Sequence, residues 1–529
     1  MITCGEALVR LLEAYGVDTV FGIPGVHTIE LYRGLPSSGI RHVTPRHEQG
    51  AGFMADGYAR VTGRPGVCLV ITGPGMTNIA TPMAQALADS IPLLVISSVS
   101  RRHQLGLGEG RLHELRRQQV VFDELSRFSH TLQRPDELPK VLARAFGLFR
   151  SARPGPVHIE IPVDVIALPA DHIDLRPWAL PAAAAPDAGQ VREAAGWLRA
   201  AARPLIAVGG GALAAGAELR CVAESLGAPV INTVNAKGLL PASHPLAVGG
   251  SGSCPAVRDA LREADVVLAV GTELGESDYD FYFVGDVEIQ GRLIRVDIDP
   301  AQLARNVRPS LAICADARQA LSALAEALGP DPAAAPDGAS RAAGLRGALR
   351  AARDGKYAAF FDAIQAALPG LVLVGDSTQP AYRAWLQYEA EAPRSYFHSA
   401  SGYGTLGYAI PAAIGARIGS PDRPVVALIG DGGAQFTLAE LGVAAELGLT
   451  VTFLLWNNNG YEEIRRFMRD VRVGPVGVDV RPPDFLKVAE GLGCRALRVR
   501  DLRSLQAALR DAATASGPSL IEVSEADFA

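Results

Sequence analysis

The sequence has few of the features that mark membrane proteins, secreted proteins and nucleic-acid-binding proteins. It contains no uninterrupted apolar run of about 18 residues, so it predicts no membrane-spanning helix. The first segment, MITCGEALVRLLEAYGV, lacks the basic start and apolar centre of a signal peptide and is typical of an amphipathic helix. The formal net charge is -6 and there is no basic run, which disfavours nucleic acid as a partner.

Cysteine is also scarce. The six cysteines are scattered, and no two of them form a C-x-x-C pair. This usage favours reduced thiols in the cytoplasm over a disulfide framework or a zinc site. We therefore expect a cytoplasmic protein that has no membrane partner.

Short apolar strands that alternate with helical stretches rich in alanine and leucine are abundant. The strand-like segments include GVCLVITG, PLLVISS, PLIAVGGG, DVVLAVG, LIRVDID, LVLVGD, PVVALIGD and TVTFLLWNN. Continuous apolar strands separated by helices are typical of parallel sheets that are covered on both faces. We expect an α/β fold made of consecutive Rossmann-like parallel sheets with flanking helices.

Two segments interrupt the alternation and divide the chain into three units. Residues 167–189 and 328–340 are rich in proline and alanine and are interpreted as linkers. The predicted domains are residues 1–170, 188–328 and 355–529. The middle unit carries a glycine-rich turn, VGGGALAAG, at residues 208–216. That turn is either a phosphate site before a helix or only a tight connection between a strand and a helix.

Polar side chains follow two strands of the third unit. Asp431 comes directly after the strand PVVALIG, and Asn457 and Asn458 follow the strand LTVTFLLW. Because ligands bind outside the carboxyl ends of strands in an open parallel sheet, these residues should lie at one sheet edge. A carboxylate, an amide oxygen and a nearby carbonyl suit Mg²⁺, and the glycines around Asp431 can present N–H groups to an anion. The pattern predicts a metal-bridged diphosphate site; the alternative is two ordinary turns.

The local structure around the candidate motifs can also be predicted. Between the two strands, TLAELGVAAELG predicts one helix, and Thr437 with Glu440 has the spacing of a capping box at its start. Near the N-terminus, VTPRHEQGAGFMADGYAR predicts a strand that ends at His47 and a helix that begins at Glu48.

The spacing from Asp431 to Asn458, 27 positions, resembles the signature of thiamine-diphosphate-dependent enzymes of the acetolactate synthase and pyruvate decarboxylase superfamily. The likeness covers nearly the whole chain. It implies a pyrimidine-binding N-terminal domain, a central domain and a C-terminal diphosphate-binding domain. It implies that Mg²⁺ is bound by the side chains of Asp431 and Asn458 and by the carbonyl group of Gly460. The implied cofactors are thiamine diphosphate and Mg²⁺, and FAD in the central domain is not favoured.

The same resemblance assigns a catalytic acid. In the family, the glutamate of an HEQGA-like motif, here Glu48, contacts N1′ of the cofactor's aminopyrimidine ring. That contact favours the 4′-imino form, which can remove the proton from C2 of the thiazolium ring. His27 is a second candidate, as a proton donor, although a loop histidine with satisfied hydrogen bonds is the alternative.

Further cofactor contacts follow from the family pattern. HSASGYGTLGYAIPAAIGA places Leu406 at the large apolar residue beneath the cofactor and Gly404 at the carbonyl that accepts the 4′-amino hydrogen. Leucine stands where methionine is frequent, which conserves volume. The other implied contacts are Pro24, Gly75, Asn78, Ser377, Thr378, Gln379, Gly430, Gly432, Gly433, Ala434 and Tyr461. Because related enzymes join the first unit of one subunit to the third unit of another, a homodimer is the expected minimum, commonly paired into a homotetramer.

The reaction itself is less closely specified. Pyruvate decarboxylases carry adjacent histidines in the first unit and a glutamate after the NN motif, whereas His103 and His113 are separated here and Ile464 stands at the glutamate position. The FQE-type triplet of acetolactate synthases is replaced by HEL at residues 113–115. Neither set is complete.

Three stretches, FGIPGVHTIELYRGLP, GEGRLHEL and WNNNGYEEIRRFM, resemble the decarboxylases of 5-guanidino-2-oxopentanoate (2-ketoarginine) in arginine catabolism. This implies decarboxylation of that 2-oxo acid to 4-guanidinobutanal; the alternative is a carboligase like acetolactate synthase. A regulatory subunit that retains the cofactor site is a hypothesis of another class.

A guanidinium tail needs carboxylates. The candidate substrate contacts are His113, Glu114, Glu462 and Glu463, with Asp278 and Asp280 as further carboxylates. Glu462 and Glu463 could instead pair with Arg465 and Arg466 on a solvated helix.

Overall fold

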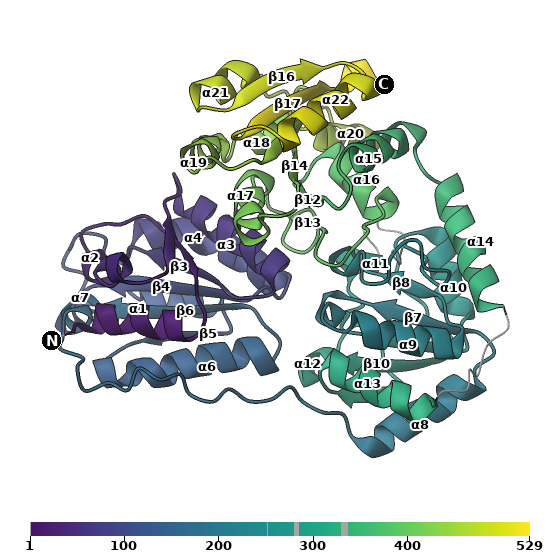
Figure 1. The fold of residues 1–529 in the computed structure, drawn as a ribbon, viewed down its shortest axis with the longest axis horizontal. Helices are drawn as coiled ribbons and strands as arrows, with labels where there is room; N and C mark the ends of the chain where they lie inside the picture. The colour runs from purple at the N-terminus through teal and green to yellow at the C-terminus, as the bar shows by residue number, and fades with distance from the viewer. Residues whose placement is uncertain (1, 251, 280–284, 330–336, 529) are drawn as a thin grey trace.

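The computed structural model describes residues 2–250, 252–279, 285–329 and 337–528. Three sheets made of parallel strands follow one another along the chain, and helices flank each of them (Figure 1). The predicted α/β class is confirmed. The division at residues 1–170, 188–328 and 355–529 stays a prediction, although each sheet lies within one of these ranges.

The first sheet has the strand order β2-β1-β3-β4-β6-β5. Its central strands are buried along their whole length, as the continuous apolar runs predict. The strands are β1 (Thr19–Phe21), β2 (Arg41–Val43), β3 (Gly66–Val70), β4 (Leu93–Val99), β5 (Phe128–Thr131) and β6 (Pro156–Pro162). The helices are α1 (Cys4–Ala14), α2 (Ile29–Tyr32), η1 (Leu35–Ser37), α3 (Glu48–Thr62), α4 (Pro74–Ala88), η2 (Arg102–Gln104), α5 (Gln118–Asp123), η3 (Pro135–Glu137), α6 (Leu138–Ser151) and α7 (Val163–Ile166).

The middle sheet has the order β11-β10-β9-β7-β8. Its strands are β7 (Pro204–Val208), β8 (Val230–Asn232), β9 (Val266–Val270), β10 (Arg292–Asp297) and β11 (Leu311–Cys314). The helices around it are α8 (Ala188–Ala200), η4 (Gly210–Ala212), α9 (Gly216–Leu226), η5 (Val234–Ala236), α10 (Pro255–Glu263), α11 (Glu276–Tyr279), α12 (Pro300–Leu303) and α13 (Ala317–Leu328); α14 (Gly338–Ala351) leads to the third unit.

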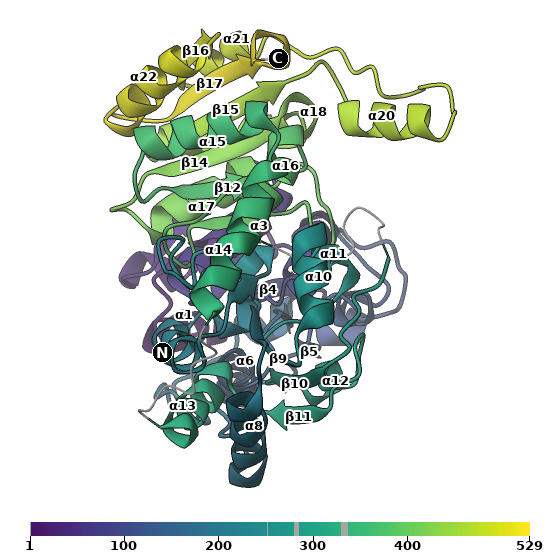
Figure 2. The ribbon, with the colours of Figure 1, turned by 90° about the vertical axis from the view of Figure 1, so that its right-hand side faces the viewer.

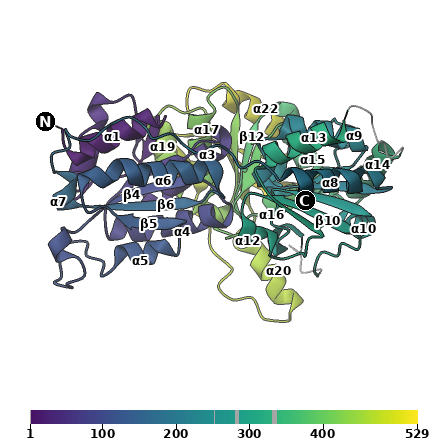
Figure 3. The same ribbon diagram turned by 90° about the horizontal axis from the view of Figure 1, so that it is seen from below.

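The third sheet has the order β13-β12-β14-β15-β17-β16. Its strands are β12 (Val372–Gly375), β13 (Tyr396–His398), β14 (Val425–Gly430), β15 (Thr452–Asn457), β16 (Arg495–Val499) and β17 (Ser519–Ser524). Its helices are α15 (Gly355–Ala367), α16 (Gln379–Gln387), α17 (Ala409–Gly419), α18 (Asp431–Ala434), η6 (Leu438–Glu440), α19 (Leu441–Glu446), α20 (Glu462–Asp470), α21 (Phe485–Gly491), α22 (Leu502–Ala513) and η7 (Glu525–Phe528). Figures 2 and 3 show α20 standing away from the body of this unit.

Helices α3 and α17 join the first and third units side by side (Figure 1). Two glycines permit this approach: a Cβ atom at Gly57 would lie 2.0 Å from the carbonyl oxygen of Ala412, and one at Gly415 would lie 1.8 Å from that of Met54. Buried side chains of both helices, including Phe53 and Ile410, belong to one continuous apolar core. Each large apolar side chain buried there stabilises the fold by about 1.5–3 kcal/mol, so the two units fold against each other.

The structure corrects two local predictions. The strand before Glu48 ends at Val43, not at His47. The stretch after Asp431 is not one capped helix but α18, η6 and α19 in succession. The hydroxyl of Thr437 donates to the carbonyl oxygen of Gly407 at 2.8 Å instead of capping a helix, and the Glu440 carboxylate accepts hydrogen bonds from the first unit. Tertiary partners therefore replaced the predicted local capping box.

Other predictions concern the termini, linkers and cysteines. The predicted N-terminal helix is confirmed as α1. The first predicted linker, residues 167–189, has almost no regular structure, and part of the second, residues 330–336, lies outside the described residues. All six cysteines are free thiols. Among the described residues, no helix combines the length and the apolar character that crossing a membrane requires.

Candidate active site

Asp431 lies at the carboxyl end of β14, beside the segment that follows β15. Its side chain is buried. One carboxylate oxygen accepts the N–H of Gly460 at 2.8 Å, and the other accepts the N–H of Asn458 at 3.3 Å. Burial raises the pKa of the Asp431 carboxyl, and these two hydrogen bonds oppose that shift. The structure thus brings the GDG and NN motifs together at one sheet edge.

The oxygen atoms around Asp431 fit a divalent cation. One end of the Asn458 amide lies 2.9 Å from the carbonyl oxygen of Gly460 and 3.1 Å from Oδ1 of Asp431. Neighbouring ligands of an octahedral Mg²⁺ lie about 2.9 Å apart, because each is bound at about 2.0–2.1 Å. With the amide oxygen at this end, the oxygens of Asn458, Gly460 and Asp431 face one another, and a cation is needed to offset their repulsion. With the amide nitrogen there, it donates to both oxygens.

Within the described residues, no three His, Cys, Asp or Glu side chains converge as a metal cluster. A cation at Asp431 would therefore depend on amide and carbonyl oxygens, which are hard ligands that suit Mg²⁺ better than zinc.

The turn that carries Asp431 is also shaped for an anion. Helix α18 begins at Asp431, and N–H groups in the first turn of a helix have no partner within the helix. A Cβ atom at Gly432 would lie 2.6 Å from the ring of Tyr461, and one at Gly433 would lie 2.9 Å from the carboxylate of Asp376. Glycine at both positions lets these side chains pack directly on the turn.

Asp376, at the end of β12, is a residue that the sequence analysis missed. It is fully buried and accepts the N–H groups of Ser377 at 2.7 Å, Gly407 at 3.3 Å and Ala409 at 3.0 Å. Burial raises the pKa of its carboxyl to about 6. Asp376 thereby ties the turn of residues 377–379 to the segment that contains Leu406. The sequence contains a pattern that could have identified Asp376, because Gly375-Asp376 at the end of β12 repeats Gly430-Asp431 at the end of β14.

The segment before α17 contains Gly404 and Leu406. Gly404 has a φ of +73°, which favours glycine. Leu406 packs against the Asp431 turn, with Cδ2 3.5 Å from the place of a Cβ atom at Gly433. Thr378 closes the same region, since its hydroxyl lies 2.8 Å from the place of a Cβ atom at Gly430.

Glu48 occupies the first position of α3, where the imidazole of His47 caps the helix by accepting the N–H of Gln49 at 3.1 Å. The Glu48 side chain is buried, and its Oε2 accepts the amide N–H of Asn78 at 2.9 Å. Gly75 lies next to it, because a Cβ atom there would be 3.5 Å from Oε1 of Glu48. Three of the predicted cofactor contacts, Glu48, Gly75 and Asn78, are thus neighbours.

His27 and His113 face each other near the start of α4. Their ring centroids lie 5.4 Å apart in an edge-to-face arrangement. Neither Nδ1 atom has a hydrogen-bond partner among the described residues, although both are buried. The backbone of His113 lies against Gly73, two residues before Gly75. In the sequence His113 is adjacent to no other histidine, and only the tertiary structure brings it beside His27. Pro24 lies on the loop that carries His27.

The predicted substrate carboxylates lie in different surroundings. Glu114 accepts the N–H groups of Gly108 at 2.8 Å and Arg111 at 3.0 Å, which folds its own loop. Glu462 pairs with Arg465 and Glu463 pairs with Arg466 on α20, as the alternative interpretation predicted. Glu463 also accepts a hydrogen bond from the buried Gln379.

Asp278 lines a cavity away from this site, and burial raises the pKa of its carboxyl to about 7. Asp280 lies outside the described residues.

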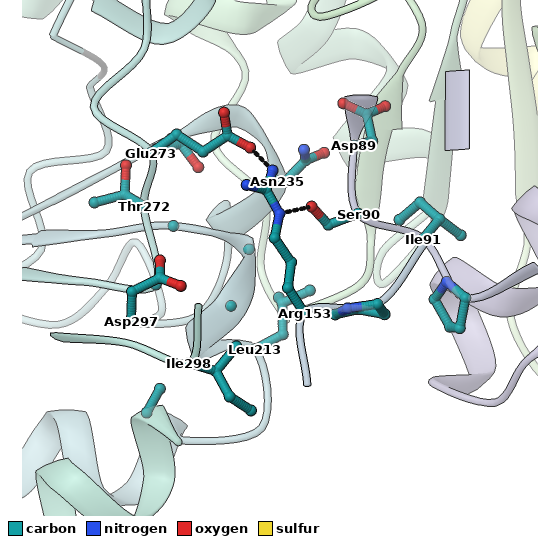
Figure 4. Close-up of a pocket in the computed structure, with 18 of the residues that line it drawn as sticks. Asp89, Ser90, Ile91, Arg153, Leu213, Asn235, Thr272, Glu273, Asp297 and Ile298 are labelled. Atoms are coloured by element: carbon teal, nitrogen blue, oxygen red, sulfur yellow. Dashed lines mark hydrogen bonds and ion pairs between the residues drawn. The ribbon is translucent and has the colours of Figure 1, made fainter. Parts of the chain in front are cut away.

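A cavity of about 540 Å³ lies where the three units meet (Figure 4). Arg153 of the first unit bridges Ser90, at 2.8 Å, and Glu273 of the middle unit. The glycine-rich turn of residues 209–211 lines the cavity, but its N–H groups at Gly209 and Gly211 donate to the carbonyl oxygens of Val270 and Gly271, at the end of β9. This turn is a tight connection between a strand and a helix.

The two halves of the predicted cofactor site lie in different units. Within the described residues, no hydrogen bond or ion pair joins the pair Glu48 and Asn78 to the pair Asp431 and Asn458.

Comparison with known proteins accounts for the three-unit organisation. The N-terminal TPP binding domain of thiamine pyrophosphate enzymes matches residues 2–125, their central domain matches residues 191–324, and their C-terminal TPP binding domain matches residues 374–523. A probable 2-ketoarginine decarboxylase of Pseudomonas aeruginosa is 48% identical, over 99% of this chain and 94% of the relative. The acetolactate synthase large subunit of Corynebacterium glutamicum is 35% identical, over 97% and 84%. The large subunit of acetolactate synthase isozyme 1 of Escherichia coli is 32% identical, over 98% and 93%.

Proposed function

The chain belongs to the family of thiamine pyrophosphate enzymes, and from this premise we propose that it decarboxylates 2-ketoarginine to 4-guanidinobutanal. The observation that carries the proposal is the 48% identity, over nearly the whole chain, to a probable 2-ketoarginine decarboxylase. The acetolactate synthases compared above are 35% and 32% identical, which favours decarboxylation over carboligation.

We assign Mg²⁺ to the Asp431 and Asn458 side chains and the Gly460 carbonyl group, supported by the spacing of these oxygens. The cofactor's diphosphate would lie against the turns that contain Ser377, Thr378, Gln379, Gly430, Gly432, Gly433, Ala434 and Tyr461. Its rings would lie between Gly404 and Leu406 on one side and Pro24, Glu48, Gly75 and Asn78 on the other. When bound, thiamine diphosphate supplies a carbon nucleophile and an electron sink that lets CO₂ leave a 2-oxo acid.

The chain's own residues then orient groups and move protons. Glu48 holds a proton at N1′ of the pyrimidine ring, and Asn78 keeps the Glu48 carboxylate in place through the 2.9 Å hydrogen bond. His27, with His113 beside it, donates the proton that the product carbon requires. Glu48 and Asp431 would serve one site from different subunits, so we propose a homodimer as the minimum and a homotetramer as the full assembly, in the cytoplasm.

The test of the function is a CO₂-release screen over 2-oxo acids with Mg²⁺ and thiamine diphosphate, in which aldehydes are separated from ligated products. We expect CO₂ and 4-guanidinobutanal from 2-ketoarginine, at a kcat/KM well above that for pyruvate. A ligated product from pyruvate, with no turnover of 2-ketoarginine, would establish the carboligase instead. Absence of CO₂ release from every 2-oxo acid would favour a regulatory role.

Glu48→Gln tests the catalytic assignment. We expect kcat to fall at least about 100-fold, because general acid–base catalysis contributes about 10²–10⁴-fold. The dissociation constant of thiamine diphosphate, measured by calorimetry, should change little. Glu30→Gln removes a half-buried, arginine-paired glutamate of the same unit and serves as the control. Wild-type turnover in Glu48→Gln would show that another group activates the cofactor.

A further inference from the structure

A chain of buried polar side chains starts at the junction of the three units. Arg60, on α3, donates to Asp56 at 2.6 Å, to Asp89 at 2.5 Å and to the side-chain oxygen of Asn235 in the middle unit at 3.1 Å. Its guanidinium also lies 5.4 Å from the ring centroid of Phe397 in the third unit. Arg60 therefore contacts all three units.

Gln85, on α4, continues this chain. Its side chain is fully buried, and its amide N–H donates to Asp89 at 2.8 Å. Asp89 accepts that hydrogen bond on the same oxygen that holds Arg60. An amide has one donor end and one acceptor end, so this contact fixes which way the Gln85 amide points. Its oxygen must then face the third unit.

The Gln85 oxygen accepts the hydroxyl of Thr405 at 2.8 Å. Thr405 precedes Leu406, the side chain that packs against the Asp431 turn. The carbonyl oxygen of Thr405 in turn accepts the hydroxyl of Ser399 at 2.6 Å. The segment of residues 399–407 is thus fixed to α4 through Gln85, while Asp376 fixes it to the third sheet.

We infer that Gln85 is a positioning residue for the cofactor, because it holds Thr405 and so sets where Leu406 lies. Asp89 and Arg60 act one step further back, by orienting the Gln85 amide. The inference rests on the proposed function for the part played by Leu406. In the proposed dimer, helix α4 would then serve both cofactor sites, one through Asn78 near its start, beside Glu48, and the other through Gln85 in its last turns, which holds the segment of Leu406.

Thr405→Val removes the hydroxyl and keeps the shape of the side chain. We expect the dissociation constant of thiamine diphosphate to rise about 3–10-fold and kcat to fall by a similar factor, the usual effect of losing one buried hydrogen bond. The near-ultraviolet circular dichroism of the bound cofactor should also change, because Leu406 moves relative to its rings. Thr405→Ser retains the hydroxyl and should restore all three readouts.

Thr450→Val is the matched control. Thr450 donates a hydrogen bond of the same length, 2.8 Å, to the carbonyl oxygen of Ala515 in the same unit, away from the candidate site. A merely structural role for Thr405 predicts that both valine variants lower Tm and that neither changes the cofactor readouts. That result would overturn the inference.

Gln85→Met provides a second, independent test. If Gln85 acts through Thr405, the double variant Gln85→Met/Thr405→Val should bind the cofactor about as weakly as the weaker single variant. Fully additive losses would show that the two residues act separately, and the inference would fail. The proposed function fails differently: the wild-type protein would bind thiamine diphosphate and release no CO₂ from 2-ketoarginine.

Discussion

At the scale of single residues, His27 and His113 are the pair whose chemistry is most easily tested. Burial lowers the pKa of His27 below its usual 6.5, and the neighbouring charge of His113 lowers it further. Both effects disfavour the protonated form. A histidine that must donate a proton is therefore active only on the acidic side of that lowered pKa.

The pH dependence of kcat follows from this sign. We expect kcat of the wild-type protein to fall as pH rises through the lowered pKa of His27. His113→Gln removes one cause of the shift, so the fall should move to higher pH. His27→Gln should abolish this limb of the profile, and His103→Gln, at an exposed histidine, should leave it unchanged. The same limb in His27→Gln would rule out His27 as the donor.

Among the proposed substrate carboxylates, Glu463 has the contacts best suited to a guanidinium group. It already holds the guanidinium of Arg466, whose side chain is 40% exposed. Gln379 fixes the other Glu463 oxygen to the proposed cofactor turn. By contrast, Arg465 beside Glu462 is also held by Asp479 at 2.7 Å.

We expect Glu463→Gln to lower kcat/KM for 2-ketoarginine by about 10–100-fold, because a charge-assisted hydrogen bond is lost. The value for 2-oxohexanoate, which has no guanidinium, should change less than about threefold. Glu462→Gln is the matched control and should affect neither substrate. Equal losses of Glu463→Gln on both substrates would assign Glu463 to the cofactor turn.

The residues that the sequence predicted and those that it did not predict differ in one physical respect. Asp431 and Asn458 lie together because each follows a parallel strand, and that placement can be derived from periodicity alone. Asp376, Gln85 and the partner of His27 act through contacts between segments far apart in the chain. Gln85 contacts another unit, and the neighbours of Asp376 and His27 come from distant segments of their own units, so a local pattern does not show these contacts.

At the scale of elements, the starts of helices show the same limit. The capping-box spacing predicted that the Glu440 carboxylate accepts the N–H of Thr437 at the start of its own helix. Instead, its carboxylate accepts the N–H groups of Arg46, at 3.0 Å, and His47, at 3.0 Å, just before α3. The spacing of a capping box was present, but the carboxylate accepts hydrogen bonds from two backbone N–H groups of another unit instead.

The ionisation of Glu440 gives a stability prediction. Burial raises the pKa of its carboxyl from 4.5 to about 7. Its folded-state pKa is thus above the unfolded one, so the stability it contributes is present below pH 4.5 and is lost as pH rises through about 7. We expect the Tm of the wild-type protein minus that of Glu440→Gln to decrease between pH 5 and pH 8. A difference that does not depend on pH, or that grows, would contradict this.

Strands were easier to predict than helices in this chain. Segments such as β4, β9 and β14 are buried along their whole length, so each is a continuous apolar run bounded by polar residues or glycine. The short strand β2 has one buried, one half-buried and one exposed residue, and its predicted end was wrong by four positions.

At the scale of the whole molecule, three sheets and two cofactor-binding units could be predicted from the sequence. The contact of α3 with α17 could not, because Gly57 and Gly415 matter only through the carbonyl groups that face them. The cavity at the junction of the units could not be predicted either, because Arg153 and Glu273, which pair beside it, are 120 positions apart in the sequence.

The central claim is that one cofactor site needs Glu48 from one subunit and Asp431 from another. The most direct test is to co-express Glu48→Gln with Asp431→Ala, each of which should be inactive alone. Random pairing makes half of the dimers mixed, and each mixed dimer has one intact site of two, so we predict about one quarter of wild-type CO₂ release. A co-expressed mixture as inactive as either variant alone would place both residues in the same chain's site and contradict the account.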